Sequence, residues 1–271
     1  MLKKIFQNLN YEEYCSSHSI NELEDLNISL KDYGKINKKK IKKWDMVLQK
    51  PLNIVPSPPE LDDLIRLHYL LTIKKSRTVL EFGVGKSTGV ILDALGKNQK
   101  EHSVYVENKL RISNPFELHS VDNYHIWLDK IKHMYKKNKN FNTHYCPVSM
   151  GTFNDRICTY YDNLPNIRPD FIYLDGPNQF GVLNNVRGIT TENPDRMPMS
   201  ADLLALEHFF EPGTMILIDG RTANARFLKS NFQRNWDYYH FESYDQHVFR
   251  LDEKPLGIWN ENALKFENEY L

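Results

Sequence analysis

The segment that most constrains this chain is residues 79–88, which read VLEFGVGKST. A short apolar run, suited to a buried strand, ends in a carboxylate and is followed by two glycines separated by one residue. Glycine has no Cβ to hold a ligand away from the backbone, and Ser and Thr follow where a helix would begin. Free N–H groups at a helix start favour anionic ligand groups. The segment therefore predicts a strand, a ligand-binding loop and a helix in succession.

Spacing separates the cofactors that such a loop could bind. The end of a phosphate-binding loop, GxxxxGK[ST], matches the residues from Gly85 to Ser87, but the motif requires its first glycine where Leu80 stands. A dinucleotide-binding loop, GxGxxG, requires a third glycine where Thr88 stands. The carboxylate of Glu81 would also repel a pyrophosphate. An NAD(P)-dependent Rossmann oxidoreductase stays as the alternative class, and a cationic cofactor suits the loop better.

From residue 78 onward, short apolar segments alternate with amphipathic ones, which is the pattern of a mostly parallel sheet covered by helices on both faces. Two segments near the end, separated by a polar turn, predict an antiparallel hairpin. We expect an α/β fold with an N-terminal helical cap at residues 1–73 and the main domain at residues 74–271. Strands are expected at 78–82, 116–121, 144–148, 171–174, 215–218, 238–242 and 247–251, and helices at 60–73, 86–95, 127–134 and 203–210.

Residues 81–88 fit the pattern ExGxGxST, which resembles motif I of the class I S-adenosylmethionine-dependent methyltransferases. In that family the glycine loop lies against the methionine part of the cofactor, and the helix start binds its carboxylate. The resemblance implies a Rossmann-like methyltransferase fold with a seven-stranded sheet, S-adenosyl-L-methionine as cofactor and S-adenosyl-L-homocysteine as product. The cofactor-binding residues that it implies here are Glu81, Gly83, Gly85, Ser87 and Thr88.

Two residues compete for the position that binds the ribose hydroxyls, which in this family is an acidic residue at the end of the second strand. Asp122 ends an apolar segment and is followed by a predicted helix, so we favour it. It lies 41 residues after Glu81, longer than the roughly 20 of a simple βαβ unit, so an insertion near residues 109–115 is expected. Glu107, at the end of residues 103–106, is the nearer alternative.

Residues 169–177, PDFIYLDGP, resemble motif IV of the same family, where the corresponding position faces the transferred methyl group. The resemblance makes Asp175 the candidate catalytic residue, which would orient or deprotonate an acceptor. A turn-forming Asp-Gly-Pro is the structural alternative. Asp219 ends the expected fifth strand and, with Arg221 and Arg196, is a candidate for binding the acceptor.

We expect no metal in the reaction. The small-molecule O-methyltransferases that use magnesium resemble this chain in strand order, but they carry an Asp-Asn pair after the fifth strand. Here Gly220 follows Asp219. Asp175 and Asp219 could still share a divalent ion through oxygen ligands, and metal-independent transfer is the default expectation.

Composition limits the partners of the chain. Its 35 Lys and Arg balance 35 Asp and Glu, so no overall charge draws it to nucleic acid or to an anionic membrane. Its three cysteines form no CxxC pair, which argues against a disulfide framework and a four-cysteine zinc site. No apolar run approaches the roughly 20 residues of a membrane helix. We therefore expect a cytoplasmic protein with a small-molecule acceptor, and a homo-oligomer is compatible with the sequence.

Basic residues outside the shared core favour an anionic acceptor. They lie in the long segment 179–200 and in the cap, where residues 38–44 read KKKIKKW. The chain also resembles bacterial methyltransferases of surface-glycan pathways. The resulting hypothesis is O-methylation of a small phosphorylated or sugar-linked acceptor in surface polysaccharide (capsule) biosynthesis. A non-catalytic partner protein that binds S-adenosylmethionine would have the same sequence at residues 81–87.

Overall fold

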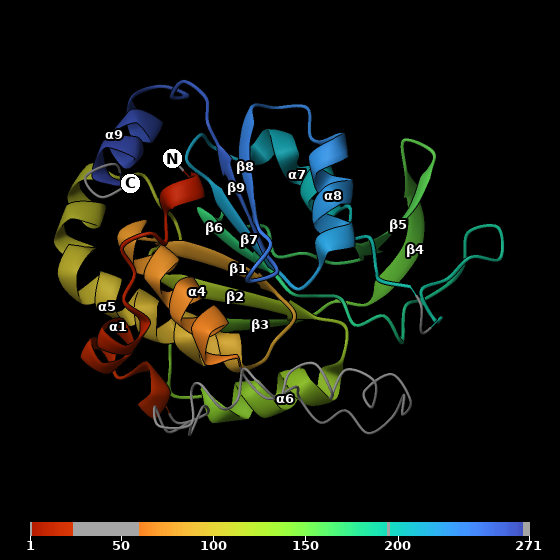
Figure 1. Ribbon diagram of the computed structural model, residues 1–271, viewed down its shortest axis with the longest axis horizontal. Helices are drawn as coiled ribbons and strands as arrows, with labels where there is room; N and C mark the ends of the chain where they lie inside the picture. Colours follow the sequence, from red (N-terminus) through yellow and green to blue (C-terminus); the bar gives the residue numbers. More distant parts are fainter. Residues whose placement is uncertain (1, 24–59, 194–195, 268–271) are drawn as a thin grey trace.

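A seven-stranded sheet forms the centre of the protein, and helices cover both of its faces (Figure 1). The structure is a computed structural model that describes residues 2–23, 60–193 and 196–267. The strands of the central sheet are β1 (Thr78–Phe82), β2 (Glu117–Asp122), β3 (Phe141–Tyr145), β6 (Phe171–Leu174), β7 (Met215–Asp219), β8 (Trp236–Phe241) and β9 (Gln246–Leu251). The helices are α1 (Tyr11–His18), α4 (Leu61–Ile73), α5 (Lys86–Lys109), α6 (His125–Met134), α7 (Asp202–Leu206), α8 (Thr222–Asn231) and α9 (Ile258–Glu267).

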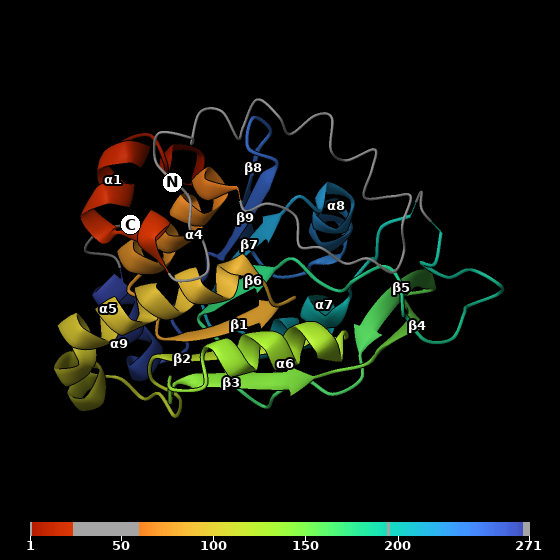
Figure 2. The same ribbon diagram turned by 90° about the horizontal axis from the view of Figure 1, so that it is seen from below.

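The strand order is β3-β2-β1-β6-β7-β9-β8, and Figure 2 shows it from β3 at the bottom to β8 at the top. Strands β3, β2, β1, β6 and β7 are parallel, whereas β9 runs antiparallel to both β7 and β8. The chain builds one half of the sheet outward from β1 and then returns to β6 on the other side of β1. This fold class is the predicted one: a Rossmann-like methyltransferase fold with a mostly parallel seven-stranded sheet and a C-terminal antiparallel hairpin.

Alternate residues of the strands fill two hydrophobic layers, as the two-residue period of a strand requires. Val79 and Phe171 belong to the layer that α4 and α5 cover. Leu80 and Ile172 belong to the opposite layer, which α7 and α8 cover. Because the central parallel strands are buried on both faces, they appear in the sequence as continuous apolar runs.

The described part of the N-terminal region shares the first of these layers, because Leu2 and Cys15 are buried in it together with α4. Arg66 of α4 is almost fully buried and donates hydrogen bonds to Gln246 at the start of β9 (2.7 Å) and to the Tyr11 hydroxyl of α1 (3.0 Å). One side chain thus joins α1, α4 and the C-terminal hairpin. The division of the chain at residue 73 stays a prediction, and the basic residues 38–44 lie outside the described residues.

Helix α5 is much longer than predicted and accounts for most of the extra spacing between β1 and β2. The expected insertion near residues 109–115 is only a short loop, and residues 103–106, considered as a strand leading to Glu107, are helical. Val104 is exposed on this helix, whereas Val106 packs against Phe266 of α9. In the sequence alone, these two valines, two residues apart, look like part of a short strand.

The strand predicted at residues 144–148 is wrong, because two strands meet there. β3 ends at Tyr145, Pro147 lacks the N–H that a continuing ladder needs, and β4 (Val148–Phe153) begins after it. β4 pairs with β5 (Arg156–Tyr161) in a separate two-stranded sheet. Asn154 and Asp155 connect them with φ angles of 47° and 62°, as in a type I′ turn.

A buried ionic cluster fixes α9 to the amino-terminal edge of the sheet. Arg77, just before β1, pairs with Asp170 and with Glu267 of α9. Lys74 pairs with Glu267 at 2.9 Å and donates to the Gly213 carbonyl at 2.9 Å. Removing one member of such a cluster leaves an unpaired charge in the interior.

We therefore predict that Glu267→Ala lowers the free energy of unfolding by about 3–5 kcal/mol, as measured by urea denaturation. Lys265→Ala is the matched control, because Lys265 lies on the same helix in an exposed pair with Glu261. It should cost no more than about 0.5 kcal/mol. Equal effects of the two substitutions would show that the buried cluster does not hold α9.

Candidate functional site

Four parallel strands end at the same edge of the sheet, and each end carries a residue that the sequence singled out. Gly83 follows β1, Asp122 ends β2, Asp175 follows β6 and Asp219 ends β7. Because the strand order reverses between β1 and β6, this edge is the topological switch point, where open α/β sheets bind their ligands. The structure thus brings these predicted residues to one edge of the sheet.

The loop between β1 and α5 has space on one side and close backbone contact on the other. Gly83 has a φ of +90°, and a Cβ there would lie 2.8 Å from the Asp175 carbonyl oxygen, so only glycine fits. A Cβ on Gly85 would meet no atom of the described residues within 4 Å, its two chain neighbours apart. The Val84 N–H donates to Asp122 Oδ2 at 2.9 Å and fixes the loop to the end of β2. The loop therefore borders an open space at Gly85.

Glu81 lies beneath this loop and is fully buried. Its carboxylate accepts hydrogen bonds from the hydroxyls of Ser87 (2.6 Å), Thr88 (2.8 Å) and Ser120 (2.5 Å). Burial raises the pKa of Glu81 to about 7, although all three hydroxyl bonds act to lower it. The hydroxyls of Ser87 and Thr88 are thus both hydrogen-bonded to Glu81 inside the protein, which ties the start of α5 to β1, and the predicted binding of the cofactor by these residues stays a prediction.

Asp122 lies at the loop, and the alternative Glu107 does not. Asp122 accepts backbone N–H bonds from Val84 and, at 2.7 Å, from Tyr124. It is mostly buried, which raises its pKa, yet each carboxylate oxygen has a second lone pair for a further donor. Glu107 lies near the far end of α5, roughly 30 Å along the helix from its start at 1.5 Å per residue.

Asp175 is 52% exposed and is held by Arg221. The Arg221 Nε lies 3.3 Å from Asp175 Oδ1, and the same guanidinium donates to the carbonyl oxygens of Asp175 (2.6 Å) and Pro177 (3.1 Å). Arg221 was predicted to bind the acceptor. In the structure its described bonds hold the segment that follows β6, so it positions Asp175.

Asp219 is surrounded by other acidic groups. It accepts a hydrogen bond from the Tyr173 hydroxyl at 3.1 Å, and burial together with the negative charge of Asp175 raises its pKa to about 7. Asp63, at the start of α4, is also buried; its own pKa is raised to about 10 by burial, Glu60 and Asp219, despite its pairing with Arg66.

Asp63 and Glu60 were not predicted from the sequence as site residues. Acidic residues in the first turn of a helix are common because they complement the helix dipole, so nothing in the sequence connects them with Asp219.

The segment between β6 and α7 forms a lobe with the β4–β5 hairpin, which projects beyond the central sheet in Figure 1. Leu183 exchanges backbone bonds with β4, at 2.9 Å to Met150 and 2.7 Å to Val148, and Thr159 of β5 donates to Met199 at 2.9 Å. Arg196 is exposed on this segment and donates to the Thr190 carbonyl oxygen at 3.2 Å. The structure does not bring it into contact with the strand-end carboxylates.

A cavity of about 750 Å³ lies at the opposite, amino-terminal edge of the sheet. Arg77, Asp170 and Glu267 line it, and they are already paired with one another. It contains none of the residues at the carboxyl ends of the strands.

In the described ranges, no helix is long and apolar enough to cross a membrane. The three cysteines are buried free thiols.

Comparison with known proteins gives distant structural matches only. No family model matches the chain, and no curated protein matches it. An O-methyltransferase from Bacillus cereus in complex with S-adenosylhomocysteine is 11% identical, with 90% of this chain and 100% of that chain covered and a TM-score of 0.40. An S-adenosylhomocysteine-bound methyltransferase from Podospora anserina is 10% identical, with 90% and 97% covered and a TM-score of 0.42. The N-methyltransferase NodS from Bradyrhizobium japonicum is 11% identical, with 82% and 98% covered and a TM-score of 0.36.

The raised pKa of Glu81 predicts a pH dependence of stability. Its pKa is about 7 in the folded protein, against the ordinary glutamate value of 4.5, so the folded state binds an extra proton between these pH values. The contribution of Glu81 to the free energy of unfolding is therefore full below pH 4.5 and is lost as the pH rises through about 7. A shift of this size corresponds to about 3 kcal/mol.

Glu81→Gln removes this titration, so its stability relative to the natural chain should improve by about 3 kcal/mol between about pH 4.5 and about pH 8. Urea denaturation at both pH values measures the difference. Glu101→Gln, at an exposed carboxylate on α5, is the control and should show no such change. A difference for Glu81→Gln that does not vary with pH would contradict the prediction.

Proposed function

We propose that this chain is an S-adenosylmethionine-dependent methyltransferase that acts on a small molecule. The observation that carries the proposal is the junction of the glycine loop with Asp122, joined by the Val84 N–H at 2.9 Å, beside the open space at Gly85. The first N–H groups of α5 have no carbonyl partner within the helix, so they suit the negatively charged carboxylate of the cofactor. The remaining lone pairs of Asp122 suit the ribose hydroxyls.

The cofactor would supply an activated methyl group on a sulfonium sulfur, and the residues present fit it. Apart from Val84 and Lys86, its chain neighbours, no described residue lies within 4 Å of where a Gly85 Cβ would stand. Glu81 is held beneath the loop, where its ionised form would attract a cationic ligand. The protein needs chiefly to hold the acceptor in line with the methyl group and to exclude competing geometries.

The structure favours this function over an NAD(P)-dependent oxidoreductase. Thr88 stands where the third glycine of a dinucleotide loop is required, and its hydroxyl is bonded to Glu81 in the interior. The next residue, Gly89, is the glycine at which α5 packs closely, because a Cβ there would collide with the Tyr135 hydroxyl. The helix therefore has its close-packing glycine one position later than the dinucleotide pattern places it.

Asp175 and Asp219 are the proposed groups that act on the acceptor. Asp219, with a pKa raised to about 7, is suited to accept a proton from a hydroxyl acceptor near neutral pH. Asp175, held by Arg221 and half exposed, is suited to orient that acceptor. Two carboxylates thus share the tasks that were predicted from the sequence for Asp175 alone.

The finer part of the proposal concerns the acceptor and its pathway. We propose O-methylation of a small phosphorylated or sugar-linked hydroxyl in surface polysaccharide synthesis, in the cytoplasm. Exposed Arg187 and Arg196, on the lobe formed by the segment before α7 and the β4–β5 hairpin, support an anionic acceptor, because guanidinium groups bind phosphates in bidentate geometry.

Ligand binding tests the cofactor. At about 100 times its dissociation constant, S-adenosylhomocysteine should stabilise the protein by about 2.7 kcal/mol and raise Tm by roughly 5 °C or more. Gly85→Leu should abolish this shift while leaving the free protein folded, because its side chain would enter the open space and its φ is extended. Gly96→Leu is the control on the same helix, where a Cβ also meets nothing within 4 Å, and should keep the shift. A shift with NAD instead, or with neither ligand, would contradict the proposal.

Methyl transfer tests the carboxylates. With radiolabelled S-adenosylmethionine and a panel of phosphorylated and nucleotide-linked sugars, the natural chain should label at least one acceptor. Asp219→Asn should lower kcat by about 100-fold or more, with the affinity for S-adenosylhomocysteine unchanged. Asp175→Asn should mainly raise KM for the acceptor. Binding of S-adenosylhomocysteine without transfer to any acceptor would favour the non-catalytic binding partner instead.

A further inference from the structure

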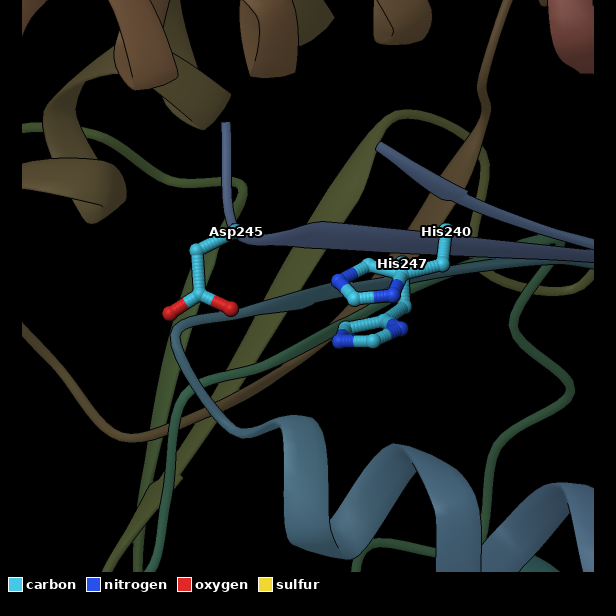
Figure 3. A group of neighbouring side chains, drawn as sticks. All are labelled: His240, Asp245 and His247. Atoms are coloured by element: carbon cyan, nitrogen blue, oxygen red, sulfur yellow. The ribbon is translucent and has the colours of Figure 1, made fainter. Parts of the chain in front are cut away.

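The C-terminal hairpin carries a histidine pair that the proposed methyl transfer does not use. His240 of β8 and His247 of β9 stand directly opposite each other in the antiparallel ladder. Their ring centroids are 3.9 Å apart, with the planes inclined by 16°. Asp245 lies in the turn before β9, with a φ of +51° that directs the chain back toward the pair. Figure 3 shows its carboxylate beside the edges of the two rings.

These three side chains can act as ligands of one ion. One ligand atom from each lies within 4.8 Å of the others, and in the described ranges no other group of three or more His, Cys, Asp or Glu side chains meets this condition. A tetrahedral ion with bonds of about 2.0–2.2 Å holds its ligand atoms about 3.4 Å apart. Side-chain rotations that move the ligand atoms by about 1 Å would close the gap. The same rotations would have to turn the stacked rings so that their lone pairs converge on the ion.

One of the nitrogens has no other use in the described part of the chain. His240 Nε2 is buried and has no hydrogen-bond partner there. A buried polar atom without a partner costs about 1–3 kcal/mol, and most such atoms in proteins are satisfied. A metal ion at this place would remove the cost.

The neighbours of His247 orient its ring as metal ligands are usually oriented. His247 Nδ1 lies 2.9 Å from the Tyr238 hydroxyl, which leaves Nε2 on the side of Asp245. The Thr222 hydroxyl lies 2.9 Å from His247 Nε2 and 2.7 Å from Asp245 Oδ1. The Thr222 hydroxyl therefore bridges the two side chains at hydrogen-bond distance, and an ion bound between them would displace it into the position of a fourth neighbour.

We propose that His240, Asp245 and His247 bind one divalent transition-metal ion of the zinc class. Two imidazoles and one carboxylate favour zinc, cobalt or nickel over magnesium and calcium, which prefer oxygen ligands alone. Thr222 is the first residue of α8, and the Gly220 N–H donates to the Asp245 carbonyl oxygen at 3.0 Å. The ion would therefore fasten the turn of the hairpin to the segment that follows β7, close to Asp219 and Arg221 but separate from the glycine loop.

Zinc and cobalt binding test the proposal on the full chain, after treatment with EDTA and desalting. Native mass spectrometry and calorimetry should show one zinc ion per chain, with a dissociation constant of about 1 μM or tighter. Cobalt should give the intense visible absorption of a tetrahedral site. His240→Gln and Asp245→Asn should each weaken zinc binding by about tenfold or more. Asn tolerates the positive φ of residue 245, so the second variant keeps the turn.

His144→Gln is the matched control. His144 stacks on His119 with ring centroids 5.3 Å apart, but this second histidine pair belongs to no three-ligand group in the described residues. Its substitution should leave zinc affinity unchanged. Absence of stoichiometric zinc binding to the natural chain would overturn the proposal. So would binding that survives both hairpin substitutions, or that is lost in His144→Gln.

Discussion

The buried carboxylate of Glu81 is the interaction on which the candidate site depends. A buried carboxylate is costly unless hydrogen bonds compensate for the loss of water, and three hydroxyls, from Ser87, Thr88 and Ser120, do so here. These bonds join β1 to the start of α5, which follows it closely in the sequence, and to β2, where Ser120 lies 39 residues after Glu81. The acidic and hydroxyl residues of the ExGxGxST pattern thus shape the loop from below, and its glycines leave the space above it free.

Acidic side chains at the other strand ends follow from the same topology. Parallel strands place their carboxyl ends at one edge, so Asp122, Asp175 and Asp219 collect there, and α4 adds Asp63. Burial, and after it the negative charges of Asp175 and Glu60, raise the pKa of Asp219 to about 7, while Arg66 acts to lower it and Arg221 pairs with Asp175. A site that can accept a proton near neutrality therefore arises from burial of a carboxylate beside other acidic groups.

The sequence predicted the parts of the fold that are decided locally. The central strands β1, β6 and β7 were found because strands buried on both faces are continuous apolar runs, and the glycine loop because its residues are adjacent. The β4–β5 hairpin was missed although Asn154 and Asp155 form a recognisable turn. Helix α9 was missed because the buried ions that hold it, Arg77 and Lys74, lie far away in the sequence. Side-chain partners were the least predictable, because Glu81 and Arg221 bind residues brought close only by folding.

We propose that the edge of the sheet formed by the glycine loop and Asp122 binds S-adenosylmethionine. The most direct measurement is a crystal structure of the protein with S-adenosylhomocysteine. We predict that the ligand lies beside Gly85, with its ribose hydroxyls donating to Asp122 and its carboxylate at the first N–H groups of α5. A ligand bound elsewhere, such as in the cavity beside α9, or one that leaves Asp122 without contact, would contradict the account.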